Sequence, residues 1–161
     1  MTMTSSTQSS INFYILPDSD EQNRLFFVFR LIEKAFDQRL PLLIIAADEA
    51  QLMHLNRLIW TAKPTRFIAH DIVTDQDLST SANIWLTTQS ALSQRLPCPP
   101  QVVIDLSYDA TPLAFPKIML ITNQHVDILP NARMKYQAYV NQGITPKVYK
   151  ISEKHLSFTD K

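Results

Sequence analysis

Hydrophobic residues in this sequence fall into short continuous runs that alternate with longer stretches of helical spacing. Residues 12–16 form the first run, and Pro17 closes it, which predicts a β-strand. Across residues 20–39 the apolar positions recur every three or four residues, and this spacing predicts a helix. Residues 42–47 are apolar throughout, as is typical of a central parallel strand that is covered on both faces.

The two predicted helices of this first half differ in how apolar they are. Phe26, Phe27 and Leu31 make the first half of helix 20–39 apolar on nearly every side, which favours deep burial over a face that contacts a partner. The second helix begins at Asp48, which forms a capping box with Gln51, and it ends before Pro64.

The second half of the chain predicts one helix and several strands. Residues 127–142 predict a helix, because Pro130 is tolerated in a first turn and Gly143 stands just past the end. Residues 146–151 carry two lysines and a proline, which predicts a last strand at a sheet edge. Three further apolar runs predict strands, at residues 83–87, 101–106 and 117–122. Residues 66–70 predict either a short strand or a loop at a strand edge.

Strands that alternate with helices across short loops predict a single α/β domain with a mostly parallel sheet flanked by helices. We expect this domain to span residues 11–161. Residues 1–10 are polar and rich in serine and threonine, which predicts a disordered tail and not a signal peptide. No apolar stretch reaches the length of a membrane span, so we expect a cytoplasmic protein without membrane contact.

The glycine content narrows the function of this fold. Gly143 is the only glycine, and phosphate-binding loops need several, because their backbone turns tightly and approaches the phosphates closely. Nucleotide chemistry is therefore excluded. The 15 lysines and arginines balance the 15 aspartates and glutamates, which argues against a broad grip on DNA. The single cysteine, Cys98, allows no disulfide.

Catalytic and metal-binding patterns are weak. The histidines have no HxxxH or HExxH spacing, and no GxSxG motif occurs, so we expect no metal, no cofactor and no catalytic residue. Asp105 ends a strand as the magnesium ligand of a nucleoside triphosphatase does, but it is better interpreted as the start of a loop. A small α/β enzyme whose pocket is built from scattered His, Asp and Ser, with His70 and Asp105 as members, stays open as an alternative.

The predicted helix 127–142 carries the most informative side chains. Arg133, Tyr136 and Gln137 are three and four residues apart, so they share one face, whereas Lys135 projects elsewhere and Tyr139 continues a neighbouring face. An arginine beside a tyrosine can bind a carboxylate and pack the group attached to it. The alternative is an ordinary amphipathic helix with a solvated arginine.

Several segments, in this order along the chain, resemble the chi subunit of bacterial DNA polymerase III holoenzyme. They are Phe13-Tyr14-Ile15-Leu16, Ile45-Ala46-Ala47-Asp48-Glu49, Leu58-Ile59-Trp60, Phe67-Ile68-Ala69-His70 and the Arg133-x-x-Tyr136-x-x-Tyr139 pattern followed by Gly143. The resemblance covers roughly residues 11–151. It implies a Rossmann-like α/β domain without a phosphate loop, and an accessory subunit that is not itself a catalyst.

The resemblance also implies partners. Chi pairs with the psi subunit, which tethers it to the clamp loader, and in some bacteria a DNA-repair helicase takes the place of psi. Another surface of chi binds the acidic C-terminal tail of single-stranded DNA-binding protein, which ends in proline, phenylalanine and a free carboxylate. DNA is then contacted only indirectly. A direct nucleic-acid binder is the third alternative, against which the balanced charge weighs.

Individual residues of the tail site follow from the same resemblance. Arg133 matches the family's cation, Tyr136 its aromatic neighbour and Phe67 a pocket wall. Thr122 stands where the family places a small apolar pocket residue. Trp60 is expected either to support the pocket floor or to be a core tryptophan.

Two positions depart from the family pattern. Gln137 stands where the family can have lysine, and Ala69 replaces the usual proline, so the strength of tail binding is in question more than the fold. We expect Lys135, Lys117 or Arg66 to restore some positive potential. For the psi surface, two candidates stay open: the apolar residues of helix 20–39, and the C-terminal segment around Tyr139 and Val148.

Overall fold

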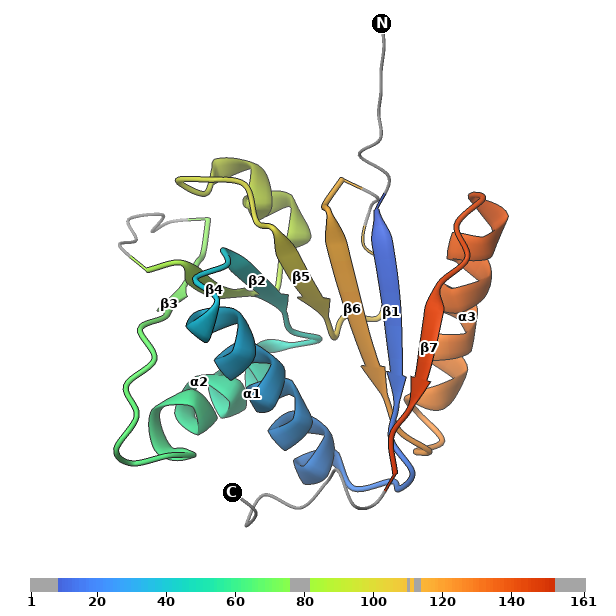
Figure 1. Cartoon of the computed structure of the whole chain (residues 1–161), viewed down its shortest axis with the longest axis horizontal. Coiled ribbons are helices and arrows are strands. Elements are labelled where there is room, and N and C mark those ends of the chain that lie inside the picture. The colour runs from blue at the N-terminus through green and yellow to red at the C-terminus, as the bar shows by residue number, and fades with distance from the viewer. Residues whose placement is uncertain (1–8, 76–81, 110, 112–113, 153–161) are drawn as a thin grey trace, which may run out of the picture.

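The computed structural model describes residues 9–75, 82–109, 111 and 114–152. Within these ranges seven strands form one sheet in the order β3-β4-β2-β5-β6-β1-β7, and all neighbouring strands are parallel (Figure 1). The α/β class that the sequence predicts is confirmed. The strands are β1 (Ser10–Ile15), β2 (Leu42–Ile45), β3 (Asp71–Ile72), β4 (Ile84–Thr87), β5 (Val102–Asp105), β6 (Lys117–Thr122) and β7 (Lys147–Lys150).

Helices cover both faces of the sheet. The α-helices are α1 (Glu21–Asp37), α2 (Glu49–Thr61) and α3 (Leu129–Asn141), and a short 3-10 helix spans Ser90–Arg95. Because side chains alternate along a strand, β2 contributes Leu42 and Ile44 to one core with α1 and α2, and Leu43 and Ile45 to a second core with α3. In Figure 1, α3 lies beside β7 and β1, whereas α1 and α2 lie toward β4 and β5.

Two residues that the sequence predicts at helix ends, Asp48 and Gly143, are found there. The Asp48 carboxylate accepts a hydrogen bond from the Gln51 N–H at 2.8 Å, and the Gln51 side-chain oxygen accepts one from the Ala47 N–H at 2.7 Å. In a standard capping box the Gln51 side chain would accept from the N–H of Asp48 itself; here it accepts from the preceding residue, Ala47. Gly143 has a φ of +89°, a left-handed conformation that favours glycine just past α3.

Some boundaries differ from the prediction. Residues 66–70 are a loop, the second of the two predicted options, and the short strand β3 follows at Asp71. Strand β1 begins at Ser10, inside the expected tail, whose residues 1–8 lie outside the described ranges. The apolar residues of α1 are buried or partly buried, so the preference for burial over a partner face is confirmed. None of the helices described is long and apolar enough to cross a membrane.

Candidate functional site

A groove of about 590 Å³ opens between α3 and β7, at the carboxyl ends of β1 and β6. Its apolar wall includes Phe13 and Tyr136, whose rings meet edge to face with their centroids 5.4 Å apart. Val148 of β7 stands next to Phe13 in the sheet, and Thr122, which is buried, lies at the end of β6. The groove is therefore built from elements that are far apart in sequence, with an apolar wall and a few polar groups, as is typical of ligand-binding sites.

The charged residues that the described part of the chain brings to this groove all have one sign. Arg133 lines it from α3 and Lys150 lines it from β7, and no aspartate or glutamate is among the described residues that line it. Both cations are exposed, and neither makes an ion pair with another residue of the described ranges. The groove thus carries positive potential although the whole chain is neutral.

Three of the six predicted site residues meet in this groove: Arg133, Tyr136 and Thr122. Gln137 is exposed and does not line the groove, and its amide donates a hydrogen bond to the Asn141 side chain at 3.1 Å. Sequence reasoning missed Lys150. The signal was available, because alternation along the predicted strand 146–151 places Val148 and Lys150 on one face.

Phe67 and Trp60 do not line this groove and instead form a second cluster beside α2. Their ring centroids are 5.1 Å apart, and Trp60 also lies 4.8 Å from the His70 ring. Phe67 is 66% exposed and Trp60 is 47% exposed, so Trp60 is not a core tryptophan; Trp85 fills that role with no exposed surface. The structure therefore separates Phe67 and Trp60 from Arg133, because α2 packs against β4, several strands away from α3 and β7.

The loop that carries Phe67 is held against α1 by ion pairs. Arg66 pairs with Glu33 at 3.3 Å and also with Asp37, and Lys63 pairs with Glu33 at 2.9 Å. The loop's other side is held by His70, whose ring hydrogen-bonds the Ile68 carbonyl at 2.8 Å and the Asn56 side chain at 2.9 Å. Arg66 is thus occupied far from the groove, which corrects its expected contribution to potential there.

Helix α3 is anchored by a buried ion pair. Lys135 Nζ lies 3.2 Å from Asp105 Oδ2, and the two side chains are 4% and 0% exposed. Lys135 also donates a hydrogen bond to the Ser107 carbonyl, and the Tyr139 hydroxyl donates one to the Thr111 carbonyl at 2.8 Å. Burial lowers the pKa of Lys135, against the opposing effect of the Asp105 charge, and burial raises the pKa of Tyr139.

This anchor corrects two expectations. Lys135 projects into the protein and cannot supply potential to the groove, and Tyr139 is fully buried, so it belongs to no docking surface. Lys117 is also excluded, since it lines a different cavity with Tyr14 and Lys34 on the face covered by α1.

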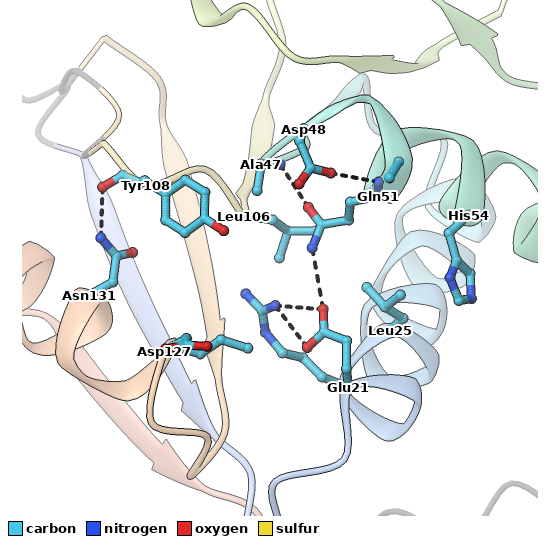
Figure 2. A pocket seen from close by; sticks show the side chains of 13 residues that line it. Glu21, Leu25, Ala47, Asp48, Gln51, His54, Leu106, Tyr108, Asp127 and Asn131 are labelled. Atoms are coloured by element: carbon cyan, nitrogen blue, oxygen red, sulfur yellow. Dashed lines mark hydrogen bonds and ion pairs between the residues drawn. The ribbon is translucent and has the colours of Figure 1, made fainter.

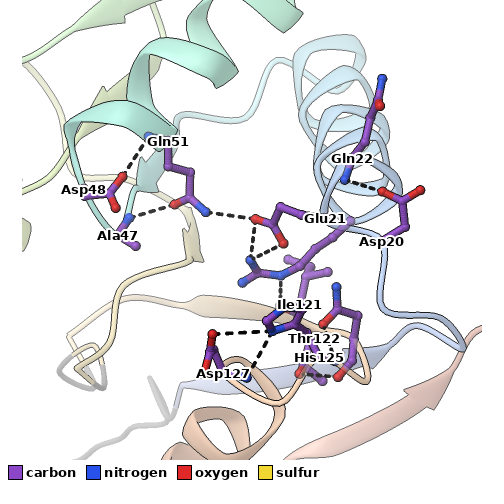
Figure 3. A network of polar contacts seen from close by, with 12 residues as sticks. Asp20, Glu21, Gln22, Ala47, Asp48, Gln51, Ile121, Thr122, His125 and Asp127 are labelled. Atoms are coloured by element: carbon purple, nitrogen blue, oxygen red, sulfur yellow. Dashed lines mark hydrogen bonds and ion pairs between the residues drawn. The ribbon is translucent and has the colours of Figure 1, made fainter.

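A third cavity, of about 290 Å³, occupies the crevice where open α/β folds usually bind ligands, at the carboxyl ends of the strands (Figure 2). Its polar side chains bind one another (Figure 3). The buried Arg24 donates to Glu21 at 3.0 Å and to the Ile121 carbonyl at 2.8 Å, and Gln51 lies 3.4 Å from Glu21. Aspartates cap α1 and α2, two of the three helices that begin here, so these two helix ends favour no further anion.

Comparison with known proteins bears on this geometry. The family model described as DNA polymerase III chi subunit, HolC, matches residues 9–147. The chain belongs to this family. The subunit chi of DNA polymerase III from Pseudomonas aeruginosa is 27% identical over 135 residues, which cover 83% of this chain and 90% of that protein. Membership in the chi family makes the chain an accessory subunit in DNA replication.

The matched region contains the aromatic cluster beside α2 and most of the groove, whereas Val148, Lys150 and Ile151 of the groove lie beyond it. The residues of the open alternative do not come together in a comparable way. His70 is hydrogen-bonded to Ile68 of its own loop and to Asn56 of α2, while Asp105 lies beneath α3 and accepts hydrogen bonds from Ser107 and from the Thr111 N–H. Both residues hold loops in place, which accounts for their burial.

The anchor of α3 leads to a test of stability. We expect Lys135→Met to lower the free energy of unfolding by about 3–5 kcal/mol, because it leaves the Asp105 carboxylate buried without its partner. Adding Asp105→Leu should recover part of the loss. Urea unfolding measures both changes, with the exposed Lys147→Met as the matched control, expected within about 0.5 kcal/mol of the parent protein. A single variant as stable as that control contradicts the anchor.

Proposed function

We propose that this protein is an adaptor that binds the acidic C-terminal tail of single-stranded DNA-binding protein in the Arg133 groove and the psi subunit through another surface. It would thereby connect the clamp loader to DNA that is already covered by protein, without binding the DNA itself. The observation that carries the proposal is the charge of the groove: among the described residues that line it are two cations and no carboxylate, in a chain with no net charge.

Each part of such a tail has a complement in the groove. A guanidinium binds a carboxylate through two parallel hydrogen bonds, and Arg133 is exposed and free of ion pairs within the described residues. The terminal phenylalanine ring fits the apolar wall of Phe13, Tyr136 and Val148. Since the tail is a flexible segment that orders on binding, we expect micromolar affinity.

The psi subunit requires a second surface, and we propose the cluster of Trp60 and Phe67. Aromatic residues are enriched at the centres of protein interfaces, and these two rings are exposed and pack together, with Trp60 also against the His70 ring. The first helix is a poorer candidate, because its apolar residues are buried or partly so. A DNA-repair helicase that replaces psi would use this same surface.

The two surfaces lie on different elements, α3 with β7 and α2 with its following loop. Both partners can then bind one chi molecule together, as an adaptor requires. The enzyme alternative lacks such support, because His70 and Asp105 are in different parts of the fold and are engaged in loop contacts. We also propose a cytoplasmic location, since DNA replication takes place in the cytoplasm of bacteria.

Removal of the groove's arginine tests tail binding. We expect Arg133→Ala to weaken binding of an acidic peptide that ends in Ile-Pro-Phe by about tenfold or more, because the terminal carboxylate loses its partner. Fluorescence anisotropy measures this change, with the exposed Arg57→Ala as control. Amidation of the peptide terminus should weaken binding to the parent protein as strongly. Binding that ignores both changes refutes the site.

Truncation of the exposed phenylalanine tests the second surface separately. We expect Phe67→Ala to weaken binding of psi by about tenfold or more while the affinity for the acidic peptide stays within about twofold. Pull-down and titration calorimetry with psi measure the first effect. Met134→Ala, which removes an exposed apolar side chain from α3, is the control. A loss of peptide binding with psi binding intact would assign Phe67 to the tail site instead.

A further inference from the structure

We propose that Lys150 is a second carboxylate-binding residue of the Arg133 groove, and that it pairs with an acidic side chain upstream of the peptide's terminal carboxylate. This inference rests on the proposed function. It assigns a role to a residue of β7, a strand outside the segments that carry the family resemblance, and it adds a positive charge to a site in which this chain has Gln137 where the family can have lysine.

The position of Lys150 is fixed by the backbone of the sheet. Strand β7 pairs in parallel with β1, and Lys150 stands opposite Ile15, which also lines the groove. The next N–H, that of Ile151, donates a hydrogen bond to the Ile15 carbonyl at 2.8 Å. The Lys150 side chain therefore extends from the end of an ordered strand, on the wall of the groove opposite α3.

Alternation along β7 separates Lys150 from the other lysine of the strand. Val148 and Lys150 line the groove, whereas Tyr149 stacks on Tyr14 with ring centroids 5.3 Å apart, and Lys147 is not among the lining residues. Tyr14 packs against the core that faces α1. The groove face of this edge strand thus carries one apolar and one cationic residue.

Two other cations that the sequence analysis expected to add positive potential are already engaged. Lys135 is buried against Asp105, and Arg66 pairs with Glu33 and Asp37 in the loop beside α1. Lys150 has no ion-pair partner in the described part of the chain. It is the cation that shares the groove with Arg133.

The two cations suit different carboxylates. The planar fork of Arg133 matches a carboxylate held in one orientation, such as a peptide terminus whose attached ring is seated in the apolar wall. A lysine is a point charge on a flexible stem, so Lys150 can follow an aspartate whose position varies along the extended upstream segment. The pair therefore recognises an acidic peptide with a free C-terminus better than a neutral one.

The experiment compares two peptides on the parent protein and three variants. The peptides are Asp-Asp-Ile-Pro-Phe and Asn-Asn-Ile-Pro-Phe, each with a fluorescent N-terminus and a free C-terminal carboxylate. The proteins are the parent chain, Lys150→Met and the matched control Lys147→Met, each measured by anisotropy at low salt. Lys150→Arg is added because it retains the charge.

We expect Lys150→Met to weaken the aspartate peptide about three- to fivefold and to leave the asparagine peptide unchanged. Lys147→Met should bind both as the parent does, and Lys150→Arg should restore aspartate binding. The difference should shrink at high salt, because exposed charges are screened.

Two outcomes overturn the role of Lys150 while the proposed function stands. One is equal weakening of both peptides by Lys150→Met, which indicates a shape effect; the other is no weakening of either, while amidation of the peptide still abolishes binding. If the parent protein binds neither peptide, the proposed tail site fails together with Lys150.

Discussion

The ion pair between Lys135 and Asp105 determines where α3 lies, and the groove depends on α3. Two charges taken out of water cost free energy, which is offset only when each is paired and hydrogen-bonded. Here Lys135 also bonds the Ser107 carbonyl, and Asp105 accepts from Ser107 and from the Thr111 N–H. The pair thereby ties the middle of α3 to the loop after β5, and this places Arg133 at the carboxyl ends of β1 and β6.

A parallel sheet normally uses the crevice at its carboxyl ends for a ligand. In this protein the polar side chains that line the crevice bind one another: Glu21, Arg24 and Gln51 are linked, and aspartates cap α1 and α2. With a single glycine, the chain also has no loop that can wrap a phosphate. The proposed partner surfaces lie elsewhere, at the sheet edge beside α3 and at the aromatic cluster beside α2.

Local patterns predicted the helices and strands well, because apolar periodicity and capping residues act over a few positions. They could not predict that Lys135 is buried, since that depends on a carboxylate thirty residues away that only the folded sheet brings near. The resemblance assigns Phe67 and Trp60 to the same site as Arg133, but a sequence motif does not show where its residues lie in the folded sheet. Lys150 is not predicted, because β7 belongs neither to α3 nor to the segments that carry the resemblance.

The central claim is that the acidic tail binds between α3 and β7. The most direct test is to record backbone amide chemical shifts of the isotope-labelled protein while an acidic peptide ending in Ile-Pro-Phe is added. We expect the largest chemical-shift changes at the end of β6, in the first half of α3 and along β7, with little change around Phe67. Changes concentrated in the loop around Phe67, or in the crevice around Arg24, would contradict it.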